Sequence, residues 1–174
     1  MSIEIGARMT INWMSTKNRK RLSGALLVEF EEEMLNTRKL LESVPEDKFD
    51  WKPHEKSHTL GQLANHVARI TVAASVIAGR RRSKPLEATS KAELLANFDN
   101  YVAESRDVLC GIDDEFLART VRVTPEISTP IYVALRGRGF MNHLIHHRGQ
   151  LSVYLRLLNV PVPGMYGPSA DEKS

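Results

Sequence analysis

The chain has 174 residues, which suits one domain better than two, because domains usually span roughly 100 to 150 residues. Hydrophobic residues make up 42% and charged residues 26%, which argues against a disordered or collagen-like chain, and the formal net charge of +3 is only a modest basic excess. The single cysteine, Cys110, excludes an intramolecular disulfide framework and a zinc cage built from thiolates, and it fits a reducing cytoplasm.

The first predicted helix follows an N-terminal segment without an assignable pattern. We treat residues 1–21 as an N-terminal arm, either extended or folded into a short helix. From Leu22 to Val44, apolar side chains recur at intervals of three and four residues with glutamates between them, which is typical of an amphipathic helix. Pro45 should end this helix, because a proline disfavours the helical conformation of the residue before it.

The second and third predicted helices each begin with a capping motif. After a loop over residues 46–57, we expect one helix over residues 59–79 and another over residues 90–111. Each starts with a threonine or serine and carries Gln62 or Glu93 three residues later. This spacing fits the capping box, in which two side chains satisfy backbone N–H groups at the start of a helix.

The last part of the chain contains one irregular stretch, one helix and a tail. Two prolines argue against a helix over residues 113–130, and weak alternation over residues 120–123 predicts a short strand or an extended link. The helical period returns over residues 131–159. The prolines and glycines of residues 160–174 predict an extended tail on the surface.

Four long amphipathic segments without a convincing strand partner predict an all-α fold. We expect residues 22–159 to pack as a four-helix bundle around a shared apolar core. The connections on either side of the third helix are longer than the shortest hairpin loops. They are compatible with a simple up-and-down order and with an up-down-down-up order that needs a crossover connection.

The directions of the histidine side chains are the most informative feature of the sequence. Three of the six histidines lie in the fourth predicted helix, within a span of five residues. Each helical residue advances by about 100°, so each side chain can be compared with the apolar stripe. On this count His143 and His147 face the core, and His66 of the second helix leans inward. His146 falls about 100° away from His147, at the edge of the stripe, where we expect solvent.

Three imidazoles directed into a small core need partners, because an unpaired buried polar group costs on the order of 1 to 3 kcal/mol. A divalent ion would satisfy one nitrogen of each ring. His143 and His147 lie one turn apart on one face, and His66 adds a third ligand from a neighbouring helix. The competing interpretation is that each ring hydrogen-bonds a carbonyl or a side chain, but the paired spacing and shared direction favour the metal site. We interpret His54 and His58 as exposed residues, with a substrate-facing role left open.

Several stretches of the sequence carry a resemblance to a known family. Residues 60–66 read LGQLANH, and residues 142–150 read NHLIHHRGQ. Trp51 and Pro53 precede the second helix, and Tyr-Gly-Pro occupies residues 166–168. On these residues the chain, over nearly its full length after the N-terminal arm, resembles the DinB family of damage-inducible proteins.

The resemblance implies a four-helix bundle that holds a divalent ion with one histidine of the second helix and an H-x-x-x-H pair of the fourth. Carried onto this sequence, the ligands are His66, His143 and His147, the same trio that helical direction selects. Relatives of this fold include thiol-dependent transferases and isomerases, so the resemblance also implies a small-molecule substrate, a low-molecular-weight thiol among them. It further implies a homodimer.

Three neutral imidazoles leave the charge of the ion uncompensated and at least one coordination position open. Such an ion lowers the pKa of bound water toward 7 or holds a thiol as its thiolate, so hydrolysis and thiol transfer both fit. Nitrogen ligands do not separate zinc from nickel or copper. The sequence between the paired histidines lacks the glutamate of the H-E-x-x-H helix, and it names no general base. His146, Arg148 and Gln150 are candidates for supporting the ligands or orienting a substrate.

Two classes of function follow. The first is a cytoplasmic metal-dependent hydrolase or thiol-dependent S-transferase that uses zinc or nickel, and the second is a stress-response protein that binds or sequesters metal without turnover. A third hypothesis is DNA contact through the basic run at residues 80–84.

This run and the one at residues 17–21 lack interleaved aromatic residues, and we interpret both as solvated segments. No apolar run reaches the roughly 20 residues that span a bilayer, and we find no secretory signal.

Overall fold

The computed structural model describes residues 4–5, 9–10, 22–79, 86–137 and 139–172. The longest helices are α1 (Leu22–Glu42), α2 (Leu60–Ile70), α4 (Lys91–Cys110) and α7 (Met141–Leu157). The shorter elements are the 3-10 helix η2 (Glu46–Lys48), the helices α3 (Ala73–Ile77), α5 (Asp114–Ala118) and α6 (Ile131–Arg136), and the strands β1 (Glu4–Ile5), β2 (Met9–Thr10), β3 (Thr120–Arg122) and β4 (Ser128–Pro130). The basic runs at residues 17–21 and 80–84 lie outside the described residues. No helix of the described residues is long and apolar enough to cross a membrane.

Contacts at the ends of α1 and α4 establish the relative direction of these two helices. The backbone N–H groups of Leu22 and Ser23, at the start of α1, donate to the Asp114 carboxylate just beyond α4 at 3.3 and 3.0 Å. The Lys91 ammonium, at the start of α4, donates to the carbonyl of Glu42, at the end of α1, at 2.8 Å. The two helices are therefore antiparallel.

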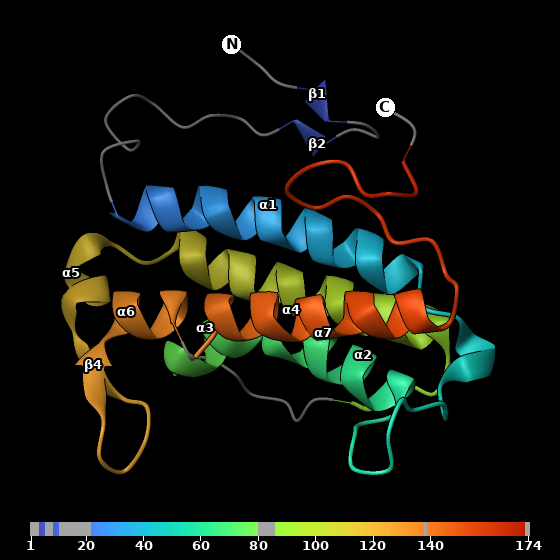
Figure 1. Ribbon diagram of the computed structural model, residues 1–174. Coiled ribbons are helices and arrows are strands. Elements are labelled where there is room, and N and C mark those ends of the chain that lie inside the picture. The colour runs from blue at the N-terminus through green and yellow to red at the C-terminus, as the bar shows by residue number, and fades with distance from the viewer. Residues whose placement is uncertain (1–3, 6–8, 11–21, 80–85, 138, 173–174) are drawn as a thin grey trace.

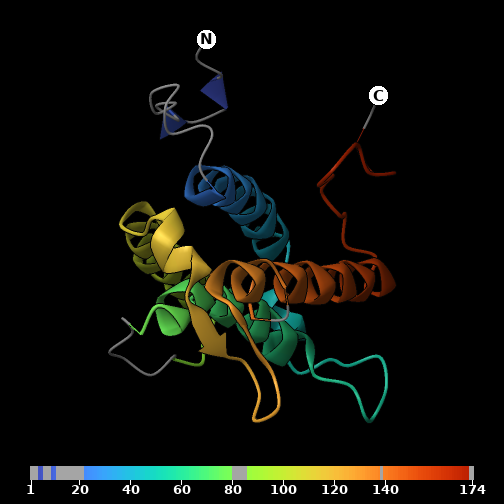
Figure 2. The ribbon, with the colours of Figure 1, turned by 90° about the vertical axis from the view of Figure 1, so that its left-hand side faces the viewer.

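The remaining directions complete an up-down-down-up order. The hydroxyl of Tyr154, near the end of α7, donates to the carbonyl of His58, just before α2, at 3.2 Å, so α7 is antiparallel to α2. Figure 1 shows α1 and α7 running in one direction and α2 and α4 in the other. This is the second of the two orders compatible with the sequence, and it makes the connection between α3 and α4 the crossover. Figure 2 shows the same helices closer to end-on, with the β3–β4 hairpin leaving the bundle beside α5.

The capping motif of α2 forms as predicted, and that of α4 forms in part. The Thr59 hydroxyl accepts from the Gln62 N–H at 3.2 Å, and the Gln62 side chain accepts from the Thr59 N–H at 3.0 Å. At α4 the Ser90 hydroxyl accepts from the Glu93 N–H at 3.2 Å. The Glu93 carboxylate, however, accepts from the N–H of Thr89, one residue earlier than a capping box requires.

The segment predicted as one helix over residues 59–79 is broken after α2. The Thr71 hydroxyl donates to the carbonyl of Ala68 at 2.6 Å. The carbonyl of Thr71 accepts from the hydroxyl of Ser105, on α4, at 2.6 Å instead of continuing the helical ladder. The prediction of a continuous helix was wrong here, because a residue of a distant helix takes the carbonyl that the next turn would have used.

The segment predicted as one helix over residues 131–159 is also divided. The helix α6 ends at Arg136, and α7 begins five residues later. Between them the N–H of Gly139 donates to the carbonyl of Ala134 at 3.2 Å, and a Cβ atom on Gly139 would lie 2.7 Å from that oxygen. The close backbone approach therefore depends on glycine, and it interrupts the helix without ending the apolar pattern.

The stretch over residues 113–130 contains more structure than predicted. The Asp113 carboxylate accepts from the N–H of Phe116 at 2.8 Å and caps the short helix α5. The strand expected near residues 120–123 is present as β3, and it pairs with β4 in an antiparallel hairpin. In the N-terminal arm, β1 and β2 likewise pair antiparallel.

Candidate metal centre

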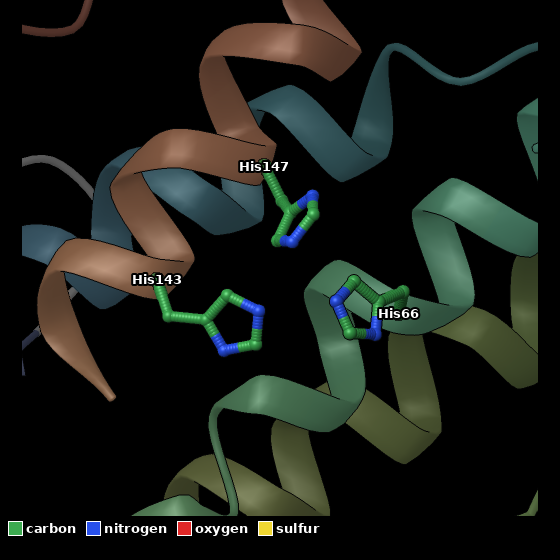
Figure 3. A group of neighbouring side chains, drawn as sticks. All are labelled: His66, His143 and His147. Atoms are coloured by element: carbon green, nitrogen blue, oxygen red, sulfur yellow. The ribbon is translucent and has the colours of Figure 1, made fainter. Parts of the chain in front are cut away.

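The three histidines selected by helical direction meet between α2 and α7. His66, His143 and His147 each offer one ligand atom, and these atoms lie within 4.8 Å of one another. Their ring centroids are 4.4 to 5.2 Å apart. Figure 3 shows one nitrogen of each ring directed toward the space between the three side chains. The structure thus brings together the predicted trio, in an arrangement that could hold one metal ion.

The packing of α2 against α7 sets this arrangement. One core cluster buries Leu63 and Val67 of α2 and Leu144 and Leu151 of α7, each within four residues of a histidine of the trio. Because His143 and His147 are four residues apart, they project from one face of α7. The apolar contacts fix the position of α2 along this face of α7. The imidazole of His66 therefore lies opposite the pair.

The sequence had suggested that the core encloses the three imidazoles. In the structure they are only half-buried. Desolvation, the largest cause, and the nearby His147 and His143 lower the pKa of His66 to about 4. Desolvation, followed by His147 and His146, also lowers the pKa of His143. Both rings are therefore neutral at pH 7, which is the form that binds a metal ion.

Hydrogen bonds at the outer nitrogens orient two of the rings. The Nδ1 atom of His147 lies 2.7 Å from the side-chain oxygen of Gln150. Because an amide oxygen only accepts, Nδ1 carries the hydrogen and the lone pair of Nε2 is left for an ion. Gln150 is thus the one supporting candidate of the sequence that contacts a member of the trio through a hydrogen bond. On the other helix, an Arg69 nitrogen lies 3.3 Å from Nδ1 of His66.

The other three histidines are exposed, as predicted. The ring of His146 lies 4.9 Å from that of His147, and the ring of His58 stacks 6.5 Å from that of His66, so both lie at the rim of the candidate centre. His54 accepts from the N–H of Lys56 within its own loop. Of the two loop histidines, His58 is therefore the one placed beside the trio.

Arg148 does not face the histidines, contrary to its candidate role in orienting a substrate. Its side chain is 1% exposed and points toward α1, where it forms an ion pair with Glu33 at 2.6 Å. It also donates to the hydroxyl of Thr37 and to that of Tyr166, in the C-terminal tail. One feature of the sequence could have indicated this buried ion pair. Glu33 lies three residues after the apolar Phe30, and therefore on the buried stripe of α1.

Cys110, at the end of α4, is not a member of the histidine cluster. Desolvation, the largest cause, and the carboxylate of Glu31 raise the pKa of its thiol. The thiol is therefore protonated at neutral pH and a poor nucleophile.

The sequence matches known protein-family models and two similar bacterial proteins. Residues 29–151 match the model of the DinB superfamily, and residues 138–174 match that of the DinB family. Two similar proteins of Bacillus subtilis strain 168, YrdA and YjoA, are both described as uncharacterized. YrdA is 26% identical over 155 residues, which cover 83% of this chain and 86% of that protein. YjoA is 27% identical over 125 residues, which cover 69% and 80%.

Solved structures share the fold. A DinB-like protein from Bacillus cereus ATCC 10987 superposes with a TM-score of 0.72 at 23% identity, covering 84% of this chain and 99% of that one. The DinB-like YjoA of Bacillus subtilis superposes with a TM-score of 0.63 at 22% identity, covering 79% and 95%. These matches confirm the predicted all-α, DinB-like bundle.

Proposed function

This chain belongs to the DinB superfamily, and from that premise we propose that it binds a divalent ion, zinc or nickel, through His66, His143 and His147. We propose further that it acts on a small molecule as a metal-dependent hydrolase or a thiol-dependent S-transferase. The observation that carries the proposal is the convergence of three ligand atoms within 4.8 Å. Ligand nitrogens on tetrahedral zinc lie about 3.4 Å apart, so small side-chain rotations suffice to close the site.

The donor set fits a catalytic centre better than a structural one. Structural zinc sites are closed by four protein ligands, whereas three leave a position for water or substrate. When bound, the ion would supply a nucleophile at neutral pH, as water of lowered pKa or as a thiolate. Gln150 holds the ring of His147 in the orientation that binding requires. The rings of His58 and His146 lie beside those of His66 and His147, which makes them candidates for contacting a substrate.

Metal analysis of three alanine variants tests the ligand assignment. Protein purified without a histidine tag should contain about one zinc or nickel ion per chain. His66→Ala, His143→Ala and His147→Ala should each lose this stoichiometric metal, because two imidazoles hold a divalent ion far less tightly than three. His54→Ala serves as the control and should retain it. Unchanged metal content in the three variants would contradict the assignment.

One observation favours the alternative, a protein that binds or sequesters metal without turnover. The described side chains in contact with the trio are His58, Arg69, His146 and Gln150, and none of these is a carboxylate that could serve as general base. Assays of the zinc and nickel forms with thiol cofactors and simple esters separate the two functions. Turnover that a chelator abolishes supports the enzyme, whereas stoichiometric metal without turnover supports sequestration.

A further inference from the structure

We infer that Arg69 is an anion-binding residue of the candidate metal centre, and that metal loading frees its guanidinium to bind a carboxylate or phosphate group of the substrate. This inference rests on the proposed function and names the substrate class for the same site. Arg69 follows His66 by three residues, on the solvent side of α2, and its side chain is 47% exposed. One of its nitrogens lies 3.3 Å from Nδ1 of His66, and another lies 3.6 Å from the carboxylate of Glu87.

The direction of the hydrogen bond between Arg69 and His66 conflicts with metal binding. A guanidinium only donates, so Nδ1 of His66 must accept, and in the neutral ring the hydrogen then lies on Nε2. The nitrogen of His66 that faces the other two histidines is the one opposite this contact (Figure 3). An ion there needs the lone pair of Nε2, which moves the hydrogen to Nδ1. Arg69 would then meet another donor, so metal loading breaks this contact.

Among the described residues, the alternative partner of the released guanidinium is Glu87, and the contact is weak. Its distance of 3.6 Å from Glu87 is longer than the roughly 2.7 to 2.9 Å of a charge-assisted hydrogen bond, and both side chains are exposed. Exposed ion pairs of this kind contribute about 0 to 1 kcal/mol. The Glu87 carboxylate therefore competes poorly with an anion that the ion itself also attracts.

The charges around the site favour an anionic ligand. Beside His66 lie the positively charged guanidinium of Arg69 and the imidazoles of His58, His143 and His147. A divalent ion with three neutral ligands adds two positive charges to this group. The planar guanidinium matches the paired oxygens of a carboxylate or a phosphate, and it lies on the same helix as one ligand. A substrate could thus place its reacting group at the ion and its anionic group on Arg69.

Anion titrations of the zinc-loaded protein test the inference. Acetate and inorganic phosphate are titrated separately by calorimetry into the wild type, Arg69→Gln and Arg122→Gln. Arg122, an exposed arginine on β3, provides the same change of charge away from the histidines. We expect at least one anion to bind the wild type and Arg122→Gln equally, and to bind Arg69→Gln roughly tenfold more weakly. The anion that shows this loss identifies the carboxylate or the phosphate class.

The zinc affinity of the metal-free proteins is the second measurement. Arg69→Gln should bind zinc as tightly as the wild type or more tightly, because the competing donor is gone. Equal anion affinities in the wild type and Arg69→Gln, or a tenfold loss of zinc affinity in the variant, would overturn the inference. A wild type that takes up neither zinc nor nickel would instead refute the proposed function itself, so the two failures are distinguishable.

Discussion

Neighbouring residues of α7 face different helices of the bundle. His147 faces α2 and the candidate metal centre, whereas Arg148, one residue later, is buried against α1. The step of about 100° between successive helical residues is the physical reason. The signature His-Arg-Gly-Gln therefore combines a candidate ligand, a structural ion pair and the hydrogen-bond partner of the ligand in one turn of helix.

The side-chain oxygen of Gln150 should contribute to the metal affinity of the candidate ligand His147. Gln150→Leu removes the acceptor of the His147 Nδ1 hydrogen, so we expect zinc affinity to fall by about tenfold or more, as measured by competition with a chelator. Gln150→Glu keeps an acceptor at the same place and should retain most of the affinity. Equal losses in the two variants would show that the hydrogen bond is not responsible.

On the side of α7 that faces α1, Arg148 should matter for stability. Arg148→Met leaves the Glu33 carboxylate, 8% exposed, without its cation, and we expect the free energy of unfolding in urea to drop by about 3 to 5 kcal/mol. The pair of Arg136 and Glu29, whose side chains are 47% and 27% exposed, provides the matched control, and Arg136→Met should cost less than about 1 kcal/mol. Similar losses in both variants would argue against the role of burial.

At the scale of elements, the C-terminal tail is fastened to the helices by side-chain contacts. The hydroxyl of Tyr166 contacts both Glu33 and Arg148, and the guanidinium of Arg148 lies 5.4 Å from its ring. Further along, Arg156 of α7 pairs with Asp171 at 2.6 Å. Residues 160–172 of the tail contain no helix or strand, and ion pairs and hydrogen bonds to α1 and α7 specify their position.

The acidic end of the tail should be released at low pH. Arg156, the largest cause, and the N–H of Val162 lower the pKa of Asp171 from its ordinary value of 3.8. A carboxylate whose pKa is lower in the folded protein stabilises its contacts above the unfolded pKa and loses them as the pH falls through the folded value. We therefore expect Val162 to be protected from hydrogen exchange at pH 5 and to lose that protection below a pH of about 3.8.

The variant Asp171→Asn separates this local effect from general acid unfolding. It should show little protection of the Val162 amide at either pH, while amides of α7 remain protected. Loss of protection throughout α7 at the same pH as Val162 would mean that the whole bundle, not the tail, responds.

At the scale of the whole molecule, an ion at the candidate centre would join α2 to α7. A ligand that binds only the folded state at 100 times its dissociation constant adds about 2.7 kcal/mol to stability. We expect zinc to raise the thermal unfolding midpoint of the wild type by several degrees and to leave that of His66→Ala almost unchanged. An equal shift in both proteins would indicate zinc binding elsewhere in the chain.

The local pattern of the sequence predicted the four amphipathic segments and the convergence of His66, His143 and His147. Helical period ties side-chain direction to residue number, so the face of each imidazole follows from its apolar neighbours. The capping box of α2 was predictable for the same reason, because its two partners are three residues apart.

The helix breaks, the order of the helices and the environment of Arg148 depend on contacts between residues far apart in the chain. Ser105 reaches Thr71 across 34 residues, and Arg148 reaches Thr37 across 111. The half-buried depth of the histidines depends likewise on how α2 and α7 pack. Periodicity specifies the direction in which a side chain points from its own helix. The packing of the whole bundle specifies which residue it contacts there.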